Sequence, residues 1–292
     1  MKTILVLTDF SINADYTAHY ALKLAQKIEA NLLLCNIYTA TPEEVRPDRK
    51  PWPLGIHEEN SVEDLGDIAA RLKTQVDKGD EKDFRPEIDQ YSKEGSITDT
   101  VNDIVSSHHI LLAVISMHSP HPLTSLFSVN HEWNIIKVAK FPLLVIPYQV
   151  RFKDYKTIAF ATDLTLTDAD VLNSLAGLAK YSDAGILIAH VANNSSTAKE
   201  GENMIKQFFH QLPLKINYPG VSFRAIKNHS VTTGLKELAQ DVTVDMLVLV
   251  KRNHNFLQRI FEKNVIRKLA GHPAKPLLIF PNKNILEKLP VF

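Results

Sequence analysis

Two carboxylates stand at matching places in the chain, each directly after an apolar run and a threonine. Asp9 closes the run Ile4–Thr8, and Asp163 closes the run Ile158–Thr162. A carboxylate at the end of a buried strand can serve as a general base, and it can equally cap the turn or helix that follows. The chain contains no Gly-x-Ser-x-Gly, Walker or His-Glu-x-x-His motif that would support catalysis. We therefore expect capping, no catalytic residues and no enzyme activity.

Metal binding by histidines is a second candidate chemistry. His118 and His121 form a His-x-x-His pair, and His131 follows ten residues later, with His108 and His109 nearby. Zinc sites need three or four ligands in tetrahedral geometry. The chain has 12 scattered histidines and no cysteine close to this group, so chance clustering is a sufficient explanation. We expect solvated loop histidines and no metal, and keep a histidine-based metal site as the weaker alternative.

The two carboxylates belong to an internal repeat. Lys2–Ser11 and Lys156–Thr165 share Lys, Thr, Ile, Thr and Asp at matching places, and the register continues without a gap to Leu33 and Leu187. A repeat of this period is too long for a solenoid. It indicates two copies of one domain within the 292 residues.

Hydrophobic periodicity predicts the same alternation of strands and helices in both copies. In the first half we expect strands at Ile4–Leu7, Leu32–Ile37, Arg85–Tyr91, Ile110–Ser116 and Leu143–Ile146, and helices from Ala14 and at Glu58–Lys78, Ile97–Ser107 and His131–Lys140. In the second half we expect strands at Thr157–Thr162, Ile186–Val191, Val221–Ile226, Met246–Val250 and Leu277–Phe280, and helices at Ala169–Tyr181, Ala198–Leu212, Val231–Gln240 and Phe261–Leu269. Asp168 and Asp170 are interpreted as the negative first turn of a helix.

Strict alternation predicts an α/β fold with two repeated, doubly wound parallel sheets of five strands each. We place the domains at residues 1–148 and 154–282, with a tail at 283–292. The proline-rich stretch Thr39–Gly55 has no counterpart in the second copy and is expected to be a surface excursion. In such sheets ligands bind beyond the carboxyl ends of the strands, where the strand order reverses. Asp9 and Asp163 would then lie at equivalent crevices.

Composition is typical of a globular protein without membrane segments. Hydrophobic residues make up 45% and charged residues 23%, and no apolar run approaches the ~20 residues of a membrane helix. The single cysteine, Cys35, and the lack of a signal-peptide pattern favour a cytoplasmic location. Basic residues are spread without aromatic partners, so no nucleic acid partner is expected.

The net charge of zero hides an asymmetry between the two copies. Residues 1–150 carry 14 basic and 21 acidic side chains, a balance of −7, and residues 151–292 carry 19 and 12, a balance of +7. Drift of solvated surface charge explains this split. Electrostatic attraction between the halves, or between two chains, is the alternative.

The chain resembles the universal stress protein family. One similarity is the first strand of each half, which ends in Thr-Asp before a turn that contains Ser or Thr. The other is the last segment of each half, Ala139–Pro147 and Ala274–Pro281. The resemblance covers both copies and implies a tandem of Rossmann-like domains of the adenine nucleotide alpha hydrolase type. It further implies a non-enzymatic stress-response protein.

In ATP-binding members the adenosine lies against the first-strand Asp and an apolar residue ending the second strand. These match Asp9 with Ile37 and Asp163 with Val191. The phosphates there lie on a Gly-x-x-Gly turn after the fourth strand and on a Gly-Ser/Thr pair opening the last helix. Here the turns read Met117–Pro120 and Lys251–His254, and the pairs read Val129-Asn130 and Lys263-Asn264. We expect degenerate nucleotide sites and no cofactor, with Asn130 and Asn264 left as helix caps. Binding of ATP or AMP, as in a nucleotide-sensing stress protein, is the alternative.

The apolar sequence of the last strand in each copy indicates how the two copies associate. Leu143–Ile146 and Leu277–Phe280 are apolar and, in the family's strand order, lie at sheet edges that proteins pair or cover. We predict that these two strands pair antiparallel and make the chain a pseudo-dimer. A homodimer of whole chains is compatible with the sequence.

Overall fold

The computed structural model describes residues 2–38, 58–80, 82–117, 135–165, 168–192, 198–211, 216–251, 269, 275–281, 289 and 292. The excursion Thr39–Gly55 and most of the predicted helix Phe261–Leu269 lie outside these described residues, so the predictions made for them are not tested. Both halves of the repeat are otherwise represented by all their predicted strands.

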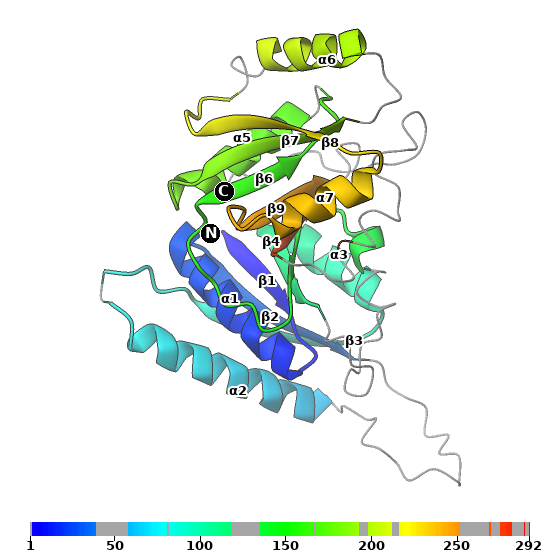
Figure 1. Ribbon diagram of the computed structural model, residues 1–292. Coiled ribbons are helices and arrows are strands. Elements are labelled where there is room, and N and C mark those ends of the chain that lie inside the picture. Colours follow the sequence, from blue (N-terminus) through cyan, green and yellow to red (C-terminus); the bar gives the residue numbers. More distant parts are fainter. Residues whose placement is uncertain are drawn as a thin grey trace.

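The described residues form ten strands and six longer helices, which follow one another along the chain in a repeated order (Figure 1). The strands are β1 (Thr3–Leu7), β2 (Asn31–Tyr38), β3 (Ile88–Glu94), β4 (Ile110–Ser116), β5 (Leu143–Ile146), β6 (Thr157–Ala161), β7 (Gly185–Ala192), β8 (Val221–Lys227), β9 (Met246–Val250) and β10 (Leu277–Phe280). The helices are α1 (Ile12–Ile28), α2 (Glu58–Asp77), α3 (Ile97–Ser107), α5 (Asp168–Lys180), α6 (Ala198–Gln211) and α7 (Val231–Gln240). Residues 135–138 form a further short helix before β5.

The strands form one ten-stranded sheet. Its order is β3-β2-β1-β4-β5-β10-β9-β6-β7-β8, so the first half (β1–β5) and the second half (β6–β10) have the same internal order. All neighbouring strands within each half are parallel, whereas β10 pairs with β5 antiparallel, with Leu278 opposite Leu144. The predicted antiparallel pairing of the two last strands is confirmed. The two sheets of five are thus joined edge to edge.

Helices cover both faces of the sheet, as a doubly wound fold requires. One buried cluster gathers Ile4 and Val6 with residues of α1, α2, α5 and α6, and the other gathers Leu5 with residues of α3 and α7. Alternate residues of β1 therefore enter opposite layers, which explains why its sequence is apolar without alternation. Each cluster runs through both halves, so the core does not stop where the repeat does.

The repeat is also visible in the backbone. Phe10 and Leu164 occupy equivalent places after β1 and β6, and both adopt the left-handed conformation, with φ of 60° and 64°. Glu29 and Asp183, the equivalent residues after α1 and α5, do the same at 55° and 49°. Bulky residues avoid this region at a cost of about 1–2 kcal/mol. Its recurrence at both pairs shows that the two halves share a turn geometry as well as a strand order.

One strand begins later than its sequence suggests. The third strand was expected over Arg85–Tyr91, but β3 begins at Ile88. Pro86 lacks a backbone N–H, and a strand interior does not accept such a residue. The backbone carbonyl of Glu87 then accepts a hydrogen bond from the N–H of Leu32 at 2.9 Å, which sets the start of the pairing with β2.

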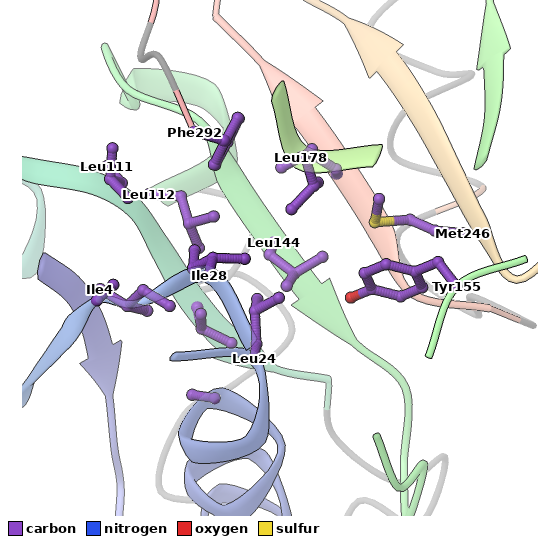
Figure 2. Close-up of a cluster of buried hydrophobic side chains, with 14 of the residues drawn as sticks. Ile4, Leu24, Ile28, Leu111, Leu112, Leu144, Tyr155, Leu178, Met246 and Phe292 are labelled. Atoms are coloured by element: carbon purple, nitrogen blue, oxygen red, sulfur yellow. The ribbon is translucent and has the colours of Figure 1, made fainter. Parts of the chain in front are cut away.

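The connection between the halves packs into the seam, meaning the β5–β10 junction and the side chains over it. The hydroxyl oxygens of Tyr20 on α1 and Tyr155 lie 2.7 Å apart in a buried hydrogen bond. Phe152 packs edge-on against both rings, at centroid distances of 5.2 and 5.7 Å. Figure 2 shows Tyr155 in the same layer as Leu24 of α1 and Leu144 of β5. The connection is therefore part of the core.

Further residues reinforce the seam on the same face. Lys27 of α1 forms an ion pair with Asp154 at 3.0 Å, and Lys2 donates a hydrogen bond to the hydroxyl of Tyr181 at 3.1 Å. Phe292 is buried near Leu112 of β4 and Leu178 of α5 (Figure 2). Phe292, in the tail predicted at 283–292, is therefore docked against the core.

Asp245 anchors the connection from the other side, and its removal gives a testable prediction. Its carboxylate accepts hydrogen bonds from the backbone N–H groups of Lys156 (2.7 Å) and Thr157 (3.0 Å) and pairs with Lys153 at 2.6 Å. Burial opposes ionisation, but the hydrogen bonds from Lys153, Lys156 and Thr157 outweigh it and lower the pKa of Asp245. Asp245→Ala should lower the free energy of unfolding by about 1–3 kcal/mol at neutral pH, because two N–H groups lose their acceptor.

The pH dependence of that loss follows from the sign of the shift. A carboxyl whose pKa is lower in the folded state adds stability above its unfolded value of about 4, and this stability disappears as pH falls through the folded-state pKa. Urea unfolding of both proteins at neutral and acidic pH should therefore show the difference shrinking in acid. A difference that grows in acid would contradict the ionised-acceptor role.

Candidate functional site

Each candidate carboxylate lies in a threonine-based turn at the carboxyl end of its strand. The hydroxyl oxygen of Thr8 accepts a hydrogen bond from the N–H of Phe10 at 3.1 Å, and that of Thr162 accepts from the N–H of Leu164 at 2.8 Å. These bonds hold the left-handed residue after each Asp. The turns stand next to β4 and β9, where the strand order of each half reverses. We call the carboxyl ends of β1 and β4 the first switch point and those of β6 and β9 the second.

At the first switch point three polar side chains, those of Asp9, Ser11 and Asn13, form hydrogen bonds with the backbone. Asp9 is buried, and its Oδ1 accepts a hydrogen bond from the N–H of Ser11 at 3.1 Å. Ser11 caps α1 by accepting from the N–H of Ala14 at 3.2 Å. Asn13 donates from Nδ2 to the carbonyl of Met117 at 3.2 Å, which links the start of α1 to the end of β4. Asp9 therefore performs the turn-capping role that the sequence favoured.

The predicted apolar residues, Ile37 and Val191, lie buried near the ends of β2 and β7. The residue before each one was not singled out from the sequence. Asn36 donates from Nδ2 to the carbonyl of Thr8 at 2.8 Å, and His190 donates from Nδ1 to the carbonyl of Thr162 at 2.9 Å. These bonds fasten the neighbouring strand to each turn. The sequence could have indicated Asn36 and His190, because each is a polar residue inside an apolar strand and the two occupy the same position of the repeat.

The second switch point is more acidic than the first. Asp163 is 3% exposed and Asp168 only 1%, and the hydroxyl of Thr162 donates a hydrogen bond to Asp168. The repeat position of Asp168 is held by Ala14 in the first half. Asp168 does stand in the first turn of α5, as expected, but it is turned inward and is not a solvated helix charge. Among the described residues, two buried carboxylates thus lie at the second switch point, against one at the first.

Met117 and Lys251 stand where ATP-binding members have the first glycine of the Gly-x-x-Gly turn, and both make contacts within the fold. Met117 is buried, with its N–H donating to the carbonyl of Ile146 at 2.9 Å. Lys251 holds the equivalent place after β9, with its N–H donating to the carbonyl of Phe280 at 2.7 Å. Its ammonium bonds to backbone carbonyls of the first half, so it is already engaged.

Several predicted site residues lie outside the described residues, and nothing tests them. They are Asn130, Asn264, His118, His121 and His131. Within the part of the chain that the structure describes, no group of three or more His, Cys, Asp or Glu side chains is arranged to hold a metal ion. The searched helices of that same part include none long and apolar enough to cross a membrane.

Comparison with known proteins decides the family. The sequence profile described as the universal stress protein family matches residues 1–147. The chain belongs to the universal stress protein family. Its second half repeats the strand order of the matched half, so the protein is a two-domain member. No curated protein matches the chain.

Solved structures agree on the fold over nearly the full length. A universal stress protein from Archaeoglobus fulgidus DSM 4304 has a TM-score of 0.62 at 12% identity, covering 96% of each chain. One from Pseudomonas aeruginosa UCBPP-PA14 has a TM-score of 0.61 at 15% identity, covering 97% of this chain and 94% of the other. A functionally unknown protein from P. aeruginosa PAO1 has a TM-score of 0.60 at 14% identity, covering 97% and 93%. At these identities the likeness concerns the fold alone.

The histidine alternative has a direct test. If His118, His121 and His131 were scattered loop histidines, Zn²⁺ would produce no specific rise in melting temperature, because only a ligand that prefers the folded state stabilises it. We expect equal melting temperatures with and without stoichiometric Zn²⁺, by calorimetry. The double variant His118→Ala with His121→Ala is the control. A stoichiometric rise in the wild type that this variant loses would establish a metal site.

Proposed function

We propose that this universal stress protein is a non-enzymatic, cytoplasmic stress-response protein whose two nucleotide sites are degenerate. The observation that carries the proposal is the bond from Asn13 to the carbonyl of Met117. It joins the start of α1 to the end of β4, across the first switch point, where a nucleotide would enter between the two strands. The Nδ2 of Asn13 and the Oδ1 of Asp9 are thus engaged in holding the fold.

Loss of the glycines supports the same proposal. A phosphate cradle needs backbone N–H groups that approach the ligand closely, which glycine permits. Met117 and Lys251 stand in those first positions, and each directs its own N–H to a carbonyl of the adjacent last strand. At the second switch point Asp168, whose repeat position in the first half is Ala14, adds a buried carboxylate that disfavours a phosphate nearby.

Adenine-nucleotide sensing remains the second candidate, favoured by one feature. Parallel pairing of β1 with β2 places Leu7 opposite Cys35, so Asp9 and Ile37 follow at adjacent strand ends. A nucleoside held there needs no phosphate cradle. Weak binding of adenosine or AMP would therefore fit degenerate sites, whereas tight binding of ATP would not.

Assembly is a further part of the proposal. The edges of β5 and β10 pair with each other inside the chain, and the outermost strands β3 and β8 end the sheet. If whole chains form a homodimer, it must use another surface than this seam. The intrachain pseudo-dimer already supplies the pairing that two separate domains would need.

Titration with Mg-ATP tests the proposal. We expect isothermal calorimetry to show no binding at micromolar affinity, and a phosphate assay to show no hydrolysis, because the glycines of the phosphate cradle are absent from both copies. Asp9→Ala is the matched control: it shows whether any small heat of titration comes from binding at the first switch point. A micromolar or tighter affinity that Asp9→Ala or Asp163→Ala removes would refute degeneracy and establish the nucleotide sensor.

A further inference from the structure

The outer edges of the ten-stranded sheet are formed by equivalent strands of the two halves. β3 ends the sheet on one side and β8 on the other (Figure 1), and among the described residues each pairs with a single neighbouring strand. Four of the seven residues in each strand are exposed. An edge strand presents backbone N–H and C=O groups that proteins cover, protect with charge or use to add another strand.

The side chains on the two edge strands differ in charge. β3 carries the exposed residues Asp89, Lys93 and Glu94, a balance of −1. β8 carries the exposed residues Arg224 and Lys227 and no acidic residue, a balance of +2. The edges thus follow the −7 and +7 balances of their halves. Two β3 edges, or two β8 edges, would bring like charges together, whereas β3 against β8 brings opposite charges together.

The contacts across the seam do not use this charge asymmetry. Among the described residues, the ion pair that crosses the seam is Lys27 with Asp154, at 3.0 Å. It takes its cation from the acidic half and its anion from the basic half, so it runs against the −7 and +7 balances. The paired strands themselves are apolar, with Leu144 opposite Leu278. Of the two electrostatic alternatives, attraction between chains therefore fits the structure better than attraction between the halves.

The directions of the strands allow the two edges to meet. Strands within each half are parallel and β5 is antiparallel to β10, so β3 and β8 of one chain run in opposite directions. A second copy placed beside the first in the same orientation offers its β8 antiparallel to β3. The helix layers match as well, because α2 and α6 belong to one buried cluster and α3 and α7 to the other.

Asp89 and Arg224 are the charged side chains that fit this arrangement. Asp89 shares a face of β3 with Tyr91, and Arg224 shares a face of β8 with Ile226. Tyr91 and Ile226 both pack in the layer of α3 and α7, so the two charges lie on one face of the joined sheet. Arg224 already pairs with Asp241 at 2.6 Å, but its side chain is 46% exposed and a guanidinium has five donors. It therefore has room for a second carboxylate.

We propose that chains of this protein associate head to tail: the β3 edge of one copy pairs antiparallel with the β8 edge of the next, and Asp89 faces Arg224 of the neighbouring chain. Main-chain hydrogen bonds hold the added strand, and the charges select the partner edge and its register. Because the contact uses different surfaces on the two copies, each bound pair keeps one free edge of each kind. The assembly therefore grows with concentration, and it does not depend on the nucleotide sites.

Sedimentation velocity of the full chain tests the association. We expect the weight-average sedimentation coefficient to rise with protein concentration at low salt. It should return toward the monomer value at about 1 M sodium chloride, where the screening length is ~3 Å. Asp89→Arg and Arg224→Asp should each be monomeric alone, because each places like charges face to face. An equal mixture of the two variants should associate again, since the exchanged charges are complementary.

Arg71→Asp is the matched control, because it makes the same charge change and also breaks an exposed ion pair, with Asp15 on α1. It should associate as the wild type does. Circular dichroism establishes that each variant folds. If Arg224→Asp does not fold, Lys227→Glu replaces it, since this change leaves the pair with Asp241 intact and should also weaken association.

Three results would overturn the proposal. The first is a wild type that stays monomeric at every concentration in low salt. The second is a sedimentation coefficient that levels off at the dimer, because a head-to-tail contact does not close with two copies. The third is association that both edge variants retain, which would place the contact on another surface.

Discussion

Leu144→Asp is expected to lower the free energy of unfolding by about 5 kcal/mol or more, enough to unfold the chain at room temperature. Leu144 is 1% exposed, lies on β5 and is paired with Leu278 across the seam. The substitution places a carboxylate in an apolar layer without a cationic partner, which the fold tolerates only by opening the β5–β10 junction. Far-ultraviolet circular dichroism during urea unfolding measures the change.

Two companion variants make this result specific to the seam. Leu278→Asp, on the opposite strand, should cost about as much, because the two residues face each other in one register. Val242→Asp introduces the same charge at a residue that is 86% exposed, and should change the free energy of unfolding by about 0.5 kcal/mol or less. If Leu144→Asp were as mild as Val242→Asp, the two last strands would not be paired in solution.

Tyr155→Ala should have the next largest effect, a loss of about 3–5 kcal/mol in the free energy of unfolding. Its ring is buried between the two halves, in edge contact with Phe152, and its hydroxyl bonds to that of Tyr20. Removing the ring leaves a cavity under the connection, and the Tyr20 hydroxyl loses its hydrogen-bond partner. Burial raises the pKa of both tyrosines, so the pair remains neutral through the physiological range.

Tyr155→Phe separates the hydrogen bond from the packing. It keeps the ring and removes only the partner of Tyr20, so about 1–3 kcal/mol should be lost. Tyr148→Ala is the control, since Tyr148 is 45% exposed and lies before the connection. Thermal and urea unfolding of the three variants measure these effects. Equal losses for Tyr155→Ala and Tyr148→Ala would show that the connection contributes nothing to the seam.

Much of the fold could be predicted, because each helix and strand shows its own hydrophobic pattern and the same order of elements occurs in both halves of the sequence. The bounds of α3, β9 and β10 follow directly from apolar periodicity and its interruptions. Pairing of β5 with β10 followed from two apolar edges that need cover. Two of the missed boundaries have a local cause: Pro86 delays the start of β3, and Ser11 caps α1 so that it begins two residues before its first predicted position.

The candidate site was less predictable, because its contacts join residues far apart in the sequence. Nothing local shows that Asn13 meets Met117, 104 residues away. Lys251 begins one of the turns that replace the family's Gly-x-x-Gly, yet the acceptors of its ammonium are carbonyls 112 to 115 residues earlier. Both contacts depend on the ten-stranded sheet being assembled. Periodicity therefore predicted where the turns lie, and only the assembled structure shows what their side chains bind.

Native mass spectrometry of the protein purified without added ligand tests the central claim, that neither switch point retains nucleotide. We expect a mass equal to that of the 32.9 kDa chain, or to a multiple of it if chains associate, with no bound small molecule. Adducts with the mass of one or two adenine nucleotides per chain, lost on substitution of Asp9 or Asp163 by alanine, would contradict it.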